Sequence, residues 1–314
     1  MWNLSYTACS FVCNKKFKNV EKADLWGEFL KSGHEKKMHN NFFSVLSEYC
    51  DLHNTLEDVS EAKRLYRMKV VDEGEKGNLY YILIEIESGR YGFKSEITDK
   101  DTQKLSYHQK ETDAPLMKFY LTVLVPKPVS GKIVYKGFMF FQNYGQFGVK
   151  TDTIAGLKRY LSDLYDYTLW VGNISPEIFV DKVLKSDNIK KISFIRNNVS
   201  QDSADSVRFT FGKEQRIIEK IRFTNEFMGR LKAYLAGSNR IFEFENKEYE
   251  DVKVNVDIGG RPRIIGLNNI ENVSVIESLP DDIKNSNGDI QTDRLVNIIC
   301  VQTEEYLKKV IYCL

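Results

Sequence analysis

The chain has 314 residues, of which 42% are hydrophobic and 28% are charged, and its formal net charge is +1. This composition excludes a wholly disordered chain, and the near-neutral charge means that any nucleic-acid contact must come from a local excess of cations. No apolar run approaches the roughly 20 residues of a membrane-spanning helix, and the polar residues before Lys15 lead us to expect no signal peptide. We therefore expect a cytoplasmic protein with no membrane partner.

Residues 1–70 are predicted to form a helical N-terminal lobe, the first of three domains. Apolar side chains recur at helical spacing within residues 25–30 and 42–49. A third helix is predicted over residues 56–68, with Asn54 or Thr55 at its start.

Residues 71–200 are predicted to form the central domain, a mixed β-sheet with packed helices. The expected strands cover residues 79–86, 119–125, 133–141, 167–171 and 189–195. The expected helices cover residues 151–164, capped by Thr151 or Asp152, and residues 175–184, with Ser175 as cap and Pro176 in the first turn. Residues 88–114 are polar and largely aperiodic, which predicts a long loop or flap.

Residues 201–314 are predicted to form a C-terminal domain built from a β-hairpin and helices. A short strand at 208–211 precedes a long helix over 213–235, and Gly237 ends that helix. Residues 252–257 and 263–267 alternate around Gly259 and Gly260, which predicts a hairpin, and 273–276 adds a third strand. An amphipathic helix is expected over 289–311. The fold class is therefore α+β.

The cysteines and histidines of the N-terminal lobe include the residue types that zinc prefers. The candidates are Cys9, Cys13, His34, His39, Cys50 and His53. Their spacing matches no zinc motif, and the five cysteines of the chain form no disulfide framework. We favour buried, reduced thiols and surface histidines, and we predict no metal and no cofactor.

A set of carboxylates supports an alternative, metal-dependent nuclease. Glu85 and Glu87 alternate onto one face of a predicted strand, and Glu96, Asp99 and Asp101 follow in the predicted flap. Such a cluster can hold a divalent cation for phosphodiester cleavage. The lysine expected beside these acids is missing from the same strand, and a solvated strand edge is the favoured interpretation.

The Gly145–Gly148 segment leads into the helix predicted from Thr151. Free N–H groups at a helix start can hold an anion, and Lys150 would add a positive charge. A tight turn into a capped helix remains the favoured interpretation. Tyr144 and Phe147 are expected to be exposed on this turn, where they could stack on a base or contact a protein.

Residues 189–241 contain more basic than acidic residues, which predicts a polyanion-binding surface. On the predicted helix over 213–235, three of these cations share one stripe. The candidate nucleic-acid-binding residues are Lys190, Lys191, Arg196, Lys213, Arg216 and Lys220.

The layout from Phe119 to Arg196 contains a strand ending in prolines, a phenylalanine-rich strand, a glycine turn, a helix and a strand-helix-strand unit. It resembles uncharacterised bacterial families of phage-defence gene clusters, and it is similar to the second component of the Kiwa system. The resemblance implies a DNA-associated effector without a recognised catalytic motif, and it transfers no individual residue.

We therefore predict a non-enzymatic accessory or effector protein of prokaryotic anti-phage defence. Its candidate partners are DNA or RNA and a phage or host protein. The alternatives are the metal-dependent nuclease and a structural subunit that forms a homo-oligomer through its C-terminal helix.

Overall fold

The computed structural model describes residues 4–16, 21–32, 38–59, 62–145, 147–174, 189–196, 214–219, 224–236, 242–244, 247–249, 251–258, 261–267 and 275–310. The chain forms two compact units. Unit 1 comprises Met1–Gly172 and Leu279–Leu314, and unit 2 comprises Asn173–Ser278. Helices and antiparallel sheets occur together in one chain, so the predicted α+β class is confirmed.

Unit 1 is built on one large sheet with the strand order β11-β1-β10-β9-β6-β5-β4. Each neighbouring pair in the part β1-β10-β9-β6-β5-β4 of this order is antiparallel. The strands are β1 (Leu4–Lys15), β4 (Glu57–Val59), β5 (Arg64–Lys76), β6 (Leu79–Arg90), β9 (Met117–Pro126), β10 (Lys136–Tyr144) and β11 (Tyr167–Asn173). Smaller elements are β2 (Phe29–Leu30), β3 (Met38–His39) and the 3₁₀ helix η3 (Asp281–Ile283).

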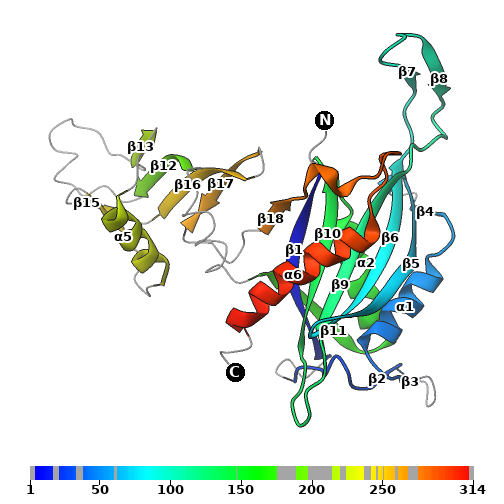
Figure 1. Ribbon diagram of the computed structural model, residues 1–314, viewed down its shortest axis with the longest axis horizontal. Coiled ribbons are helices and arrows are strands. Elements are labelled where there is room, and N and C mark those ends of the chain that lie inside the picture. The colour runs from blue at the N-terminus through cyan, green and yellow to red at the C-terminus, as the bar shows by residue number, and fades with distance from the viewer. Residues whose placement is uncertain are drawn as a thin grey trace. The chain divides into compact units, whose positions relative to one another are not determined.

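Both faces of this sheet are covered by helices (Figure 1). Side chains alternate along β6, so Ile82 and Ile84 enter a core that also holds α1 (Phe42–Leu52) and α2 (Lys150–Leu164). Tyr81 and Leu83 point to the opposite face. There α6 (Thr292–Val310) crosses the strands and buries one apolar stripe, formed by Leu295, Val296, Ile299 and Cys300.

The predicted helical lobe of residues 1–70 is wrong except for α1. β1 lies between β10 and β11, so both of its edges are paired, and residues on both of its faces are buried, including Ser5, Thr7 and Ser10. Such a strand has no alternation of polar and apolar residues that would reveal it. Residues 25–30 form a turn and β2, and the helix predicted over 56–68 is replaced by β4 and the start of β5.

The predicted loop at residues 88–114 contains the hairpin of β7 (Ser95–Thr98) and β8 (Leu105–Gln109). Figure 1 shows this hairpin extending beyond the end of the large sheet. Its apolar side chains Ile97, Leu105 and Tyr107 are exposed. Without burial on either face, the sequence of the hairpin lacks the hydrophobic pattern that marks a strand.

Unit 2 contains a sheet with the order β13-β12-β16-β17. Its elements are β12 (Ile189–Arg196), β13 (Glu214–Glu219), α5 (Asn225–Ala236), β14 (Phe242–Phe244), β15 (Lys247–Tyr249), β16 (Asp251–Ile258), β17 (Arg261–Gly266) and β18 (Val275–Ser278). The predicted hairpin is confirmed as β16 and β17. The elements predicted at 175–184 and 208–211 lie outside the described residues, as do Gly237, Gly259 and Gly260.

The helix predicted over residues 213–235 is wrong in its first part. Glu214–Glu219 is a strand that pairs with β12, with Phe194 opposite Arg216. Its residues alternate between half-buried and exposed, as expected for strand pairing. Only the later part is helical, as α5.

The two units do not coincide with the three predicted domains. β5 continues through the predicted boundary at residue 70, and β1 pairs with β10 across it. α6 belongs to unit 1 rather than to a C-terminal domain, although the helix itself is confirmed. Sheet pairing between segments far apart in the chain accounts for both differences.

Candidate functional site

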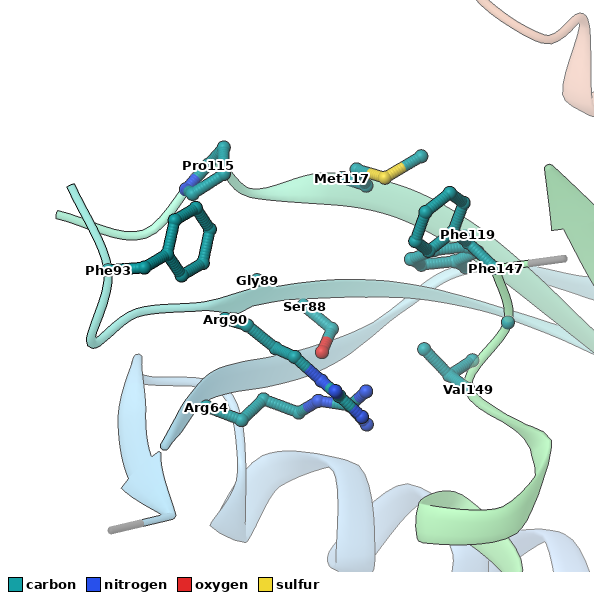
Figure 2. Close-up of a pocket in the computed structure, with 11 residues that line it drawn as sticks. Arg64, Ser88, Gly89, Arg90, Phe93, Pro115, Met117, Phe119, Phe147 and Val149 are labelled. Carbon is teal, nitrogen blue, oxygen red and sulfur yellow. The ribbon is translucent and has the colours of Figure 1, made fainter. Parts of the chain in front are cut away.

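A cavity of about 570 Å³ lies in unit 1 where β5, β6 and β9 approach the start of α2 (Figure 2). The residues that line it combine cations, aromatic rings and a helix start. They are Arg64, Ser88, Gly89, Arg90, Phe93, Pro115, Met117, Phe119, Phe147, Gly148 and Val149.

Two arginines form the positive part of the cavity. Arg64 and Arg90 are directly opposite each other in the antiparallel pair of β5 and β6. Arg64 Nη1 pairs with Asp152 Oδ2, whereas Arg90 has no ion-pair partner among the described residues. Burial lowers the pKa of Arg64, and the charge of Arg90 lowers that pKa further. Like charges opposite each other destabilise a sheet, and a bound anion would relieve this cost.

The start of α2 forms the adjacent wall. The N-cap is Val149, whose side chain makes no capping hydrogen bond, so the predicted capping by Thr151 or Asp152 is wrong. Asp152 is turned to Arg64 instead. A hydrogen bond of 3.2 Å between Tyr66 Oη and Thr153 Oγ1 fixes this end of α2 to β5. The first N–H groups of a helix carry partial positive charge and attract anions.

Two buried donors in the cavity lack partners. Ser88 is 6% exposed, and its Oγ has no hydrogen-bond partner among the described residues. Arg64 Nε is unpartnered in the same part of the chain. Figure 2 shows the Ser88 hydroxyl on the side of the two guanidinium groups. Buried polar groups are normally hydrogen-bonded, so these two donors are available to a ligand that supplies acceptors.

Aromatic rings complete the cavity. Tyr144 N donates to Phe147 O at 3.0 Å and Phe147 N donates to Tyr144 O at 2.8 Å, which confirms the predicted tight turn. Phe147 lines the cavity together with Phe93 and Phe119. The ring of Tyr144 instead packs against Phe119, with ring centroids 5.8 Å apart.

Gly89 allows β6 to pass close to the segment before β9. A Cβ atom there would lie 2.4 Å from the carbonyl oxygen of Pro115, so Gly89→Ala must displace a wall of the cavity. We expect a loss of about 1–2 kcal/mol in the free energy of unfolding, measured by urea denaturation. Gly172→Ala is the control, because no atom lies within 4 Å of its Cβ position. Equal stability of the two variants would contradict this account.

The predicted nucleic-acid-binding residues belong to unit 2. Lys191 Nζ lies 3.3 Å from Glu219 Oε1, and Arg196 Nε donates to Glu214 Oε2 at 2.6 Å. Arg216 lies over the ring of Phe244, 5.3 Å from its centroid, and Lys190 is exposed. Lys213 and Lys220 lie outside the described residues. The predicted stripe of helical cations is wrong, because Arg216 belongs to a strand.

Glu85 and Glu87, the strand carboxylates of the alternative nuclease hypothesis, are engaged with cations. Glu85 contacts Lys69 at 3.1 Å and Lys118 at 3.8 Å, and Arg67 Nε donates to Glu87 at 2.7 Å. In the predicted flap, Glu96 lies 3.6 Å from His108. Glu85 and Glu87 do share one strand face, as predicted, but both lie on an interior strand and are 8% exposed, so the favoured interpretation of a solvated strand edge is wrong.

The cysteines and histidines predicted as weak zinc candidates do not come together. Cys9, Cys13 and Cys50 are buried and free. His39 Nε2 contacts Glu48 at 2.8 Å and His53 Nδ1 contacts Glu57 at 2.9 Å, whereas His34 lies outside the described residues. Within the described part of the chain, no three His, Cys, Asp or Glu side chains are placed to hold a metal ion.

A second cavity, of about 770 Å³, is acidic. It lies beside α1 and is lined by Glu48, Asp51 and Glu73, with Trp26 and Tyr80 among its aromatic residues. Glu48 also holds a cluster of polar side chains together. Lys31 Nζ and Tyr165 Oη donate to its carboxylate, and His39 contacts it. This cavity repels anions, so the two cavities differ in the ligands they can accept.

No family model, no curated protein and no solved structure matches the chain. No helix in the described ranges has the length and apolar character needed to cross a bilayer.

Proposed function

We propose that this protein binds single-stranded nucleic acid without cleaving it, and that it acts as an accessory or effector in prokaryotic anti-phage defence. The observation that carries the binding proposal is the arginine pair, Arg64 and Arg90, in an aromatic-walled cavity at the start of α2. The defence setting rests on the resemblance of the Phe119 to Arg196 layout.

The cavity combines the two features that single-stranded nucleic acid needs. Guanidinium groups form charge-assisted hydrogen bonds with phosphate oxygens, and an exposed ring offers a platform for an unstacked base. Phe147 and Phe93 are 40% and 47% exposed, so each ring presents surface to a ligand. In a duplex the bases are already stacked, so we expect weaker binding of double-stranded DNA.

The test is fluorescence anisotropy with labelled single strands of DNA and RNA and with the matched duplex, at several salt concentrations. We expect binding that weakens with salt and leaves the probe intact with magnesium present. The combined Arg64→Gln and Arg90→Gln variant should bind at least about tenfold more weakly, because hydrogen bonds to charged groups contribute about 1.5–3 kcal/mol.

The matched control changes two cations of unit 2, Lys190→Glu and Arg216→Glu. We call the combined Arg64→Gln and Arg90→Gln variant the pocket variant. If the control loses affinity for the single strand and the pocket variant keeps it, the interface lies in unit 2, as the sequence predicted, and the cavity is not the binding site. Cleavage of the probe with magnesium would favour the nuclease alternative. Absence of binding would shift the search to protein partners, for which the exposed Ile97, Leu105 and Tyr107 of the β7–β8 hairpin are available.

A further inference from the structure

We propose that the cavity of Arg64 and Arg90 takes a terminal phosphomonoester, at the end of a nucleic-acid strand or on a free nucleotide, rather than a phosphodiester within a strand. This inference rests on the proposed function and specifies the ligand of the same site.

The charge of the cavity favours a phosphomonoester. Asp152 offsets one of the two guanidinium charges, through its ion pair with Arg64. What remains is the charge of Arg90 and the helix start of α2, together about +1.5. A phosphomonoester carries about −1.5 to −2 at neutral pH, whereas each phosphodiester carries a single negative charge. The monoester therefore matches the cavity more closely.

The donors of the cavity also suit a group with three free oxygens. Ser88 Oγ and Arg64 Nε are buried and unpartnered among the described residues. Arg90 adds a guanidinium from the neighbouring strand, and α2 begins without a side-chain cap. Figure 2 shows the Ser88 hydroxyl and both guanidinium groups gathered on one side of the cavity. A monoester offers three strong acceptor oxygens to these groups, and the linkage of a diester removes one of them.

The size of the cavity is consistent with one nucleotide. Its volume of about 570 Å³ lies within the range of about 300–1,000 Å³ that is typical of small-ligand sites. Phe147 and Phe93 are the more exposed rings of its lining, and Phe119 is buried. A nucleotide whose phosphate contacts Arg64, Arg90 and Ser88 can place its base on one of the two exposed rings.

The test compares one oligonucleotide in three forms, with a 5′-phosphate, with a 3′-phosphate and with hydroxyls at both ends. A nucleoside monophosphate serves as competitor. We expect a terminal phosphate to raise affinity at least about tenfold, and we expect the monophosphate to displace the phosphorylated strand. These measurements distinguish a strand end from a free nucleotide as the ligand. A site for a strand end prefers one of the two phosphorylated ends, whereas a site for a free nucleotide binds the monophosphate as tightly as it binds the strand.

Two conservative variants link the effect to the cavity. Ser88→Ala removes the buried hydroxyl, and Arg64→Lys keeps the charge but removes the Nε donor. Each should weaken binding of the phosphorylated strand about three- to tenfold, and each should lower the ratio between the affinities for the phosphorylated and hydroxyl forms. Circular dichroism checks folding, and Arg64→Lys carries the test if Ser88→Ala fails to fold.

The outcomes separate this inference from the proposed function. Equal affinity for phosphorylated and hydroxyl strands, with the pocket variant still impaired, would overturn the terminal-phosphate inference and leave strand binding in place. Binding of the monophosphate with no binding of any strand would support the terminal phosphate and overturn the proposed function. Loss of the preference for the phosphorylated strand in Ser88→Ala and in Arg64→Lys would support the terminal-phosphate inference and the proposed function together.

Discussion

Arg90→Glu is expected to weaken nucleic-acid binding by at least about a hundredfold while making unit 1 more stable. The substitution removes a charge-assisted donor and places a carboxylate where we propose that the phosphate lies. Removal of the donor alone costs about 1.5–3 kcal/mol of binding free energy, and repulsion adds to it. We therefore expect affinity for a phosphorylated single strand to fall by at least about a hundredfold, measured by fluorescence anisotropy.

Stability should change in the opposite direction. In the native chain Arg90 lies opposite Arg64, which is only 16% exposed as a side chain. Replacing a like-charge pair with an opposite-charge pair across two strands contributes about 0.5–1 kcal/mol. Urea denaturation of the unliganded protein should show this gain. The combination of lower affinity and higher stability is informative. Substitution of a residue that serves only the fold is not expected to stabilise the protein while it weakens ligand binding.

Lys94→Glu is the matched control for this prediction. Lys94 lies near the same end of the sheet but is 77% exposed, and it contacts Glu111 at 3.8 Å. Its substitution should change affinity less than about threefold and stability by less than about 1 kcal/mol. If Arg90→Glu lowers stability and affinity in parallel, Arg90 supports the fold and does not hold a ligand.

The elements predicted best from the sequence have a nearly continuous apolar run or apolar positions at helical spacing. β6, β9 and β12 combine apolar runs with clear ends, and α2 keeps its apolar positions at helical spacing, so all four were predicted close to their observed positions. β1 was missed because it is buried on both faces with serine and threonine among its residues. The sequence predicts a helix for Glu214–Glu219, because nothing in that segment reveals that β12 is its partner.

The candidate site was predictable only in part. The Gly145–Gly148 turn and the ring of Phe147 are recognisable in the sequence. An anion site at the start of the following helix is the less favoured interpretation of the same segment. Arg64 and Arg90 fall in a predicted helix and a predicted loop, so the sequence pattern does not place them together. Only the register of β5 and β6 brings the two side chains together. If residues 64–76 are predicted as a strand, their pairing with residues 79–90 in a hairpin places Arg64 opposite Arg90.

Glu48→Gln is expected to lower the free energy of unfolding by about 2 kcal/mol, because the carboxylate accepts charge-assisted hydrogen bonds that a neutral amide cannot replace. Glu48 lies on α1, and its partners Lys31, His39 and Tyr165 come from three other segments. The interaction therefore ties the region of β2 and β3 and the end of α2 to α1. Urea denaturation at neutral pH measures the loss.

The same carboxylate predicts a pH dependence. Partial burial alone would raise the pKa of Glu48, but the hydrogen bonds from Lys31 and Tyr165 and the contact with His39 outweigh it and lower the pKa from 4.5 to about 2. A lowered pKa means that the folded state favours the charged form. Its contribution to stability is complete above pH 4.5 and is lost as the pH falls towards about 2.

The difference in stability between the native chain and Glu48→Gln should therefore shrink as the pH falls through this window. Glu75→Gln is the control, because Glu75 is 61% exposed and pairs with Lys127 alone among the described residues. Exposed pairs contribute about 0–1 kcal/mol, so its effect should be small at every pH. A stability difference for Glu48→Gln that stays constant down to pH 2 would show that the variant acts through packing, and that the carboxylate charge does not hold α1 to its neighbours.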